Sequence, residues 1–118
     1  MTTLLAEGLE FESAYCTSPA ILYAAQYVAG GLALQLVSDD GIGEPLATLS
    51  VWVEGVSDSL AFNEFVVKSY SENEGVDDWL MEANLAQPTG RYVFFGDVGG
   101  AIFRLNEALS ATLKGTQQ

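Results

Sequence analysis

The sequence lacks several residue types on which common sites are built. It has no histidine, one cysteine and four basic residues among 118 positions. Zinc sites need histidine or cysteine ligands, so this composition argues against a zinc centre. Cys16 alone cannot form an internal disulfide, which is typical of a reducing compartment. The opening "MTTLLAEGLEFE" has no positively charged region of the kind that begins a secretory signal, so we expect a cytoplasmic protein.

Positive charge is scarce. Sixteen acidic residues against four basic ones give a formal net charge of −12. A field of this sign repels nucleic acid and anionic lipid and attracts cationic partners. The sequence therefore predicts no direct binding to nucleic acid or membranes. The simplest explanation of the charge is that it keeps the protein soluble.

Charge of either sign is absent from residues 13–38. About twenty apolar residues can cross a bilayer, but Gln26, Gln35 and the Gly30–Gly31 pair favour a β-hairpin. Apolar β-surface that is not covered internally tends to be covered by another subunit, and symmetric dimers are the commonest solution. The residues that we predict for a homodimer contact are Tyr15, Leu22, Tyr23 and Tyr27. Alternatively, one face of the hairpin packs under a helix and the other is only weakly polar.

The remaining pattern alternates between strand and turn signals. Leu32, Leu34 and Leu36 recur at period two, and residues 46–55 alternate again after the "SDDGIGEP" loop. Residues 62–69 are either a strand or a short helix capped by Asn63. Further strands are expected at 91–95 and 101–105, joined by "GDVGG", and a terminal helix is expected after Asn106.

The segment "SYSENEGVDDWLME" predicts the main helix, over residues 74–86. Ser71 and Glu74 match a capping box, with Asn73 as a rival cap. An apolar stripe at helical spacing faces the core, and it consists of Val76, Trp79, Leu80 and Ala83. "QPTGR" then reads as a turn. The predicted fold is a single α+β domain over 1–118: an antiparallel sheet of four to five strands, packed on one face by the main helix, with a short C-terminal helix.

No catalytic or metal-binding motif is present. Carboxylates with no histidine or nucleophile beside them do not predict an enzyme. The "DDGIGE" loop lacks the twelve-residue ligand pattern of an EF-hand, and "GDVGG" lacks the lysine and helix of a P-loop. We predict no cofactor and no metal.

From about residue 31 to 105 the chain carries "GLALQLV", "GEPLATLSV", "FVVKSYSENEG" and "PTGR", followed by a spaced set of single positions, Val93, Gly96, Val98, Arg104 and Leu105. In these strings it resembles a family of small, acidic, uncharacterised bacterial proteins that are often carried on phages and integrative elements. The family is a domain of unknown function, so the resemblance implies an accessory role, such as anti-defence (anti-CRISPR-like) inhibition, and no catalytic residues.

The distribution of charge gives the functional hypothesis. Between Asp39 and Glu82, eleven acidic residues share the sequence with one base, Lys68. Such a surface could imitate the phosphate row of a duplex and bind a basic, nucleic-acid-binding protein. The residues predicted for this partner-binding face are Asp39, Asp40, Glu44, Glu72, Glu74, Asp77, Asp78 and Glu82. The alternative is a homodimeric structural or housekeeping domain whose charge serves solubility only.

Overall fold

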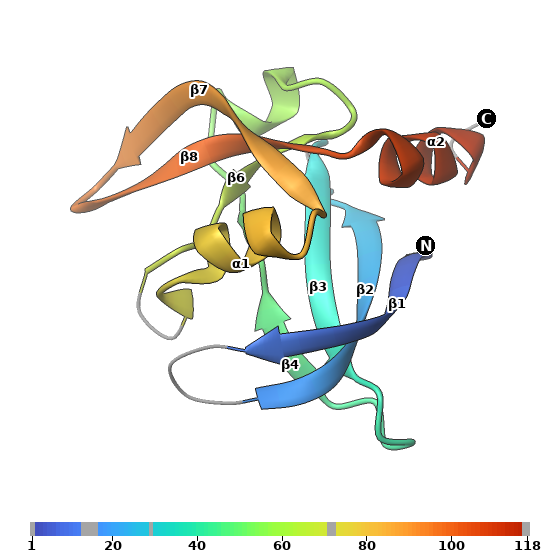
Figure 1. Cartoon of the computed structure of the whole chain (residues 1–118). Coiled ribbons are helices and arrows are strands. Elements are labelled where there is room, and N and C mark those ends of the chain that lie inside the picture. Colours follow the sequence, from blue (N-terminus) through green and yellow to red (C-terminus); the bar gives the residue numbers. More distant parts are fainter. Residues whose placement is uncertain (1, 13–16, 29, 71–72, 117–118) are drawn as a thin grey trace.

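The computed structural model describes residues 2–12, 17–28, 30–70 and 73–116, and they form two four-stranded antiparallel sheets and two main helices (Figure 1). The first sheet has the strand order β1 (Thr3–Glu12), β2 (Thr17–Gln26), β3 (Leu32–Ser38) and β4 (Pro45–Thr48). The second sheet has the order β5 (Ser50–Val51), β6 (Glu64–Val67), β8 (Val98–Leu105) and β7 (Ala86–Phe95). The α+β class is confirmed, but the prediction of one sheet was wrong.

The predicted hairpin is formed by β2 and β3. Leu32, Leu34 and Leu36 are all buried, as their period-two spacing predicted. At the turn, the amide of Tyr27 donates to the carbonyl oxygen of Gly31, and that of Gly30 donates to the carbonyl oxygen of Tyr27. Gly31 has a φ of 104°, and a Cβ there would lie 2.8 Å from the backbone oxygen of Ser57 in a short 3₁₀ helix (Ser57–Ser59), so only glycine fits.

The segment 46–55, predicted to form one strand, forms two strands that belong to different sheets. β4 ends at Thr48 and β5 begins at Ser50, and the fully buried Leu49 stands between them. The amide of Leu49 donates to the carbonyl oxygen of Leu34 in the first sheet, while its own carbonyl oxygen accepts from the amide of Lys68, just after β6. The chain therefore changes sheets at Leu49. The ambiguous segment 62–69 forms strand β6.

The main helix, α1 (Val76–Glu82), is shorter than the predicted range of 74–86. Gly75 precedes it in a left-handed conformation, and Asn84 ends it with a φ of 58°. Asn73 is not its cap, because the buried Asn73 side chain donates from Nδ2 to the carbonyl oxygen of Thr48. Ser71, the other predicted cap, lies outside the described residues.

Helix α1 lies between the sheets rather than over one of them. Of its predicted apolar stripe, Val76, Trp79 and Leu80 are buried in one core with both sheets, and Ala83, at the end of the helix, is partly buried against that core. The ring of Trp79 meets Phe11 of β1 edge-on at 5.0 Å, and Trp79 Nε1 donates to the carbonyl oxygen of Glu10. After α1, the chain turns directly into β7, which passes above the helix in Figure 1.

Residues 87–91, predicted to be a turn, lie inside β7. The register of β7 with β8 shifts between Pro88 and Tyr92, so the turn residues form an irregularity within the strand. The hydroxyl of Thr89 donates to the carbonyl oxygen of Ile102 there, and Gly90 adopts a φ of 89°. Proline is tolerated because β7 is an edge strand.

The terminal helix, α2 (Glu107–Thr116), begins as predicted. The amide of Leu109 donates to Asn106 Oδ1 at 2.7 Å, which is the contact of an N-cap, and Leu109 and Leu113 are buried against the core. Asn106 also donates from Nδ2 to the carbonyl oxygen of Asn84 at 2.7 Å. Neither helix in the described part of the chain is long and apolar enough to cross a membrane.

We expect Asn106→Ala to lower the free energy of unfolding by about 1 kcal/mol, because it leaves the amide of Leu109 without its side-chain acceptor. Asn106→Asp keeps an acceptor but loses the donor to Asn84, and it should cost less than the alanine variant. Urea unfolding followed by circular dichroism measures both. Equal stability of wild type and Asn106→Ala would contradict this account of the cap.

Candidate functional site

The carboxylates of α1 lie on the side of the helix away from its buried stripe. Glu74, Asp78 and Glu82 are exposed, and Asp77 is partly buried. Asp77 and Asp78 are in the first turn, where negative charge interacts favourably with the helix dipole. Glu72, predicted for the same surface, lies outside the described residues. We call Glu74, Asp77, Asp78 and Glu82 the α1 carboxylates.

The other predicted acids lie elsewhere. Asp39, Asp40 and Glu44 are exposed in the loop between β3 and β4, which Figure 1 shows at the far end of the first sheet from α1. Asp40 also shapes this loop, because its Oδ1 accepts from the amide of Ile42 and the hydroxyl of Ser38, both at 3.0 Å. These two hydrogen bonds lower the pKa of Asp40. The structure therefore divides the seven predicted acids that it describes into two groups.

Two of the four bases are held by one buried carboxylate. Glu64 is 4% exposed, and its Oε2 accepts from Arg91 Nη2 at 2.5 Å and from Arg104 Nη2 at 2.7 Å. Its Oε1 accepts from the amide of Ala61. Burial alone would raise the pKa of Glu64, but the hydrogen bonds from the two guanidinium groups and the amide outweigh it and lower the pKa to about 2.

This cluster lies on the outer face of the second sheet. Glu64 pairs with Arg104 in the ladder, and the neighbouring pair Phe65 and Phe103 points the opposite way, into the core. On the outer face too, Phe95 meets the ring of Tyr70, over which Lys68 Nζ lies at 5.8 Å. Three of the four bases therefore lie on the side of the second sheet that faces away from α1. The two arginines of this group, Arg91 and Arg104, are both paired with Glu64.

The predicted dimer residues do not form one surface. Leu22 is fully buried in the core of a single chain, and Tyr27 donates to or accepts from the hydroxyl of Ser50 at 2.9 Å. Tyr15 lies outside the described residues. Tyr23 is on the outer face of the first sheet, opposite Gln35. The side chains of β2 and β3 on this outer face alternate with buried ones and carry no charge: Ile21, Tyr23, Ala25, Ala33, Gln35 and Val37.

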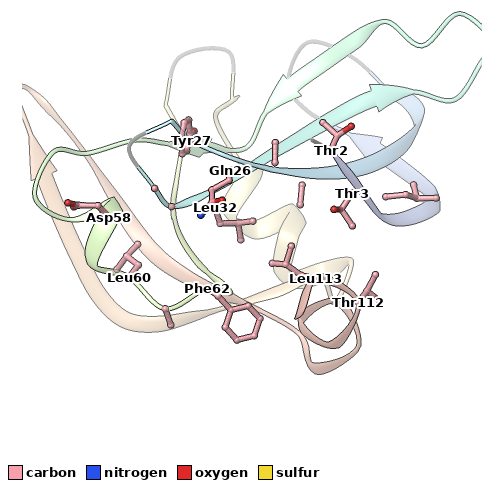
Figure 2. A pocket seen from close by; sticks show the side chains of 16 residues that line it. Thr2, Thr3, Gln26, Tyr27, Leu32, Asp58, Leu60, Phe62, Thr112 and Leu113 are labelled. Carbon is pink, nitrogen blue, oxygen red and sulfur yellow. The ribbon is translucent and has the colours of Figure 1, made fainter. Parts of the chain in front are cut away.

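A cleft of about 1100 Å³ opens where the two sheets separate (Figure 2). Its walls come from the start of β1, the β2–β3 turn, residues 58–62 and α2. The side chains that Figure 2 shows around it include Thr3, Gln26, Tyr27, Asp58, Phe62 and Leu113. Among the described residues that line it, Asp58 is the one carboxylate. In the described ranges, no cluster of three or more metal-ligating acidic or cysteine side chains occurs.

Comparison with known proteins returns no match to any family model, curated protein or solved structure. The suggested resemblance to phage-borne acidic proteins therefore stays a prediction.

We expect Glu64→Gln to lower the free energy of unfolding at pH 7 by about 1–3 kcal/mol, because a charge-assisted acceptor of two guanidinium groups is lost. The pKa of Glu64 is lower in the folded chain, at about 2, than its ordinary value of 4.5. Its stabilisation is therefore complete above pH 4.5 and declines as the pH falls toward 2. Urea unfolding at pH 7, 4 and 2.5 should show the difference between wild type and variant shrinking.

The matched control is Glu54→Gln, since Glu54 is exposed. It should change the stability by less than about 0.5 kcal/mol at pH 7. A Glu64→Gln penalty that stayed constant from pH 7 to 2.5 would rule out the lowered pKa as its cause.

Proposed function

We propose that this chain is a non-enzymatic acidic binding protein whose α1 carboxylates contact a basic protein partner. Its role would be that of a mobile-element accessory protein, acting as a nucleic-acid mimic or as an anti-defence inhibitor. The supporting observation is the segregation of charge. The α1 carboxylates are on one side of the second sheet, and Arg91 and Arg104 are bound to Glu64 on the other.

The segregation matters because charges are screened beyond about 8 Å at physiological ionic strength. The two arginines are already bound to Glu64, so they are poorly placed to neutralise the helix. Because the α1 carboxylates lie on and next to one short helix, a basic group that contacts one of them is also attracted by its neighbours before salt screens the interaction. The loop acids Asp39, Asp40 and Glu44 would add to long-range attraction rather than to the contact itself.

The test is a charge-removal variant, Glu74→Gln with Asp78→Asn and Glu82→Gln, measured by calorimetry with a decalysine peptide. Three lost contacts of about 0.3–1 kcal/mol each should weaken binding by roughly tenfold at 50 mM salt and flatten its salt dependence. The control removes the same charge at the exposed positions Glu7, Glu54 and Glu107. It should weaken binding less than about threefold. Equal effects of the two triple variants would exclude α1 as the contact.

The second candidate function is a homodimeric structural domain, and the uncharged outer face of β2 and β3 favours it. A second copy also carries −12, so two copies can approach closely only where neither presents charge. The face around Tyr23 meets this condition.

Light scattering at several concentrations decides this second candidate. A dimer would have twice the chain mass of 12.6 kDa, and Tyr23→Glu should return it to the monomer by placing a buried charge in the contact. Gln26→Glu, at the exposed end of β2, is the matched control and should remain dimeric. A wild-type monomer at all concentrations would exclude the dimer.

A further inference from the structure

The hairpin of β7 and β8 carries two exposed aromatic rings. Tyr92 is 57% exposed and Phe94 is 82% exposed, and their ring centroids are 5.0 Å apart. An aromatic side chain of this size that stays in water forgoes a large gain in free energy from burial. Paired exposed rings are typical of the anchors of protein interfaces, where tyrosine and phenylalanine are enriched.

Both rings belong to the core-facing side of the second sheet. Tyr92 pairs with Ala101 and Phe94 pairs with Gly99, and paired residues of antiparallel strands point to the same face. Ala101 packs on the core, and so does Phe103, two residues further along the same face. The apolar face of the sheet thus continues past the end of the core. Figure 1 shows the hairpin tip extending beyond α1.

Gly99 holds the tyrosine in place. A Cβ at Gly99 would lie 2.5 Å from Tyr92 Cε1, so the ring lies directly across the glycine. Any larger residue at this position would push the ring away from the strand. The position of the Tyr92 ring against the strand is therefore restricted, so this ring loses less conformational entropy on binding than a side chain without such a contact.

Helix α1 packs beside β7 and carries one exposed apolar side chain and several acidic ones. Trp79 contacts the first sheet, and the helical spacing places Asp77 and Met81, one turn apart, on the opposite flank of the helix. Met81 is 36% exposed. Glu74 before the helix and Asp97 in the hairpin turn are exposed as well. Arg91 and Arg104 project from the other face of the sheet to Glu64.

We propose that Tyr92, Phe94 and Met81, the aromatic hairpin surface, dock an apolar side chain of a basic protein segment whose flanking lysine or arginine residues contact Asp77, Glu74 and Asp97. This proposal rests on the proposed function and adds its apolar anchor. Charge complementarity selects the occupant. A second copy of the chain would place its own carboxylates next to the acidic residues around this surface, and a nucleic acid would place phosphates there. Both are therefore repelled.

The experiment compares two peptides, decalysine and a peptide with five lysines on each side of a Leu-Phe-Leu segment. Wild type should bind the Leu-Phe-Leu peptide at least tenfold more tightly than decalysine. Phe94→Ser, alone and with Tyr92→Ser, should reduce this ratio to below about threefold and leave the decalysine affinity unchanged. Ile42→Ser is the control, because Ile42 is 73% exposed in the distant β3–β4 loop and should leave the ratio intact.

The two proposals fail in different ways. The charge-removal variant should weaken both peptides equally and so preserve the ratio; if it weakened neither, the proposed function would be wrong. A ratio that survives Phe94→Ser and Tyr92→Ser overturns the aromatic anchor alone. A wild-type dimer that dissociates in Phe94→Ser would assign the surface to a second copy and overturn the basic partner. Circular dichroism spectra identical to that of the wild type would show that the variants are folded, so that a change in affinity reflects the exposed side chains.

Discussion

The passage of the chain from one sheet to the other at Leu49 is the constraint on which the rest of the structure depends. This residue is fully buried, and its two backbone groups bond to different sheets, the amide to Leu34 and the carbonyl oxygen to the amide of Lys68. Unpaired backbone groups at such a buried position would be costly, so the two sheets are fixed to each other at this point. Next to it, Ser50 Oγ accepts from the amide of Leu34 and bonds to the hydroxyl of Tyr27. The angle between the sheets leaves room for α1 on one side and opens the cleft on another.

The same arrangement separates the charges. Because α1 fills the space between the sheets, its polar side is directed outward next to the hairpin of β7 and β8. The outer face of the second sheet, in contrast, needs the arginine pair to keep Glu64 in a buried strand. Without both arginines, the Glu64 carboxylate would be an unpaired buried charge, which is strongly destabilising. The two arginines are therefore held at Glu64, on the opposite side of the sheet from the α1 carboxylates.

Local patterns in the sequence predicted much of this fold. The spacing of Leu32, Leu34 and Leu36, the cap at Asn106 and the stripe through Val76 and Leu80 are each decided by neighbours within a few residues. The division of strands at Leu49 was missed because alternation continues unbroken through it, and only contacts with Leu34 and Lys68 show that the sheet changes. Strand β1 was missed because Gly8 and two register shifts break its alternation. A turn at Pro88 and Gly90 was predicted because those residues favour turns, whereas an edge strand accommodates them as an irregularity.

The candidate site was predicted in part. Exposure of the α1 carboxylates followed from helical spacing, but their separation from Asp39, Asp40 and Glu44 depends on where a loop is placed in three dimensions. Glu64 had a recognisable sequence feature, a single charge beside three apolar strand residues, which requires a basic partner in the fold. The exposed rings of Tyr92 and Phe94 had none, because in sequence they are indistinguishable from the buried aromatics of a central strand.

The irregularities in β1 and β7 have a consequence for how the molecule behaves at high concentration. These two ten-residue strands are the longest edges of the two sheets, and both have broken registers, at Leu4 to Leu9 in β1 and at Pro88 to Tyr92 in β7. A regular edge of this length would be a template for adding strands from other molecules, whereas both edges are irregular and β7 also carries Pro88. Resistance to fibril formation is thus built into the backbone, and would persist in salt strong enough to cancel electrostatic repulsion.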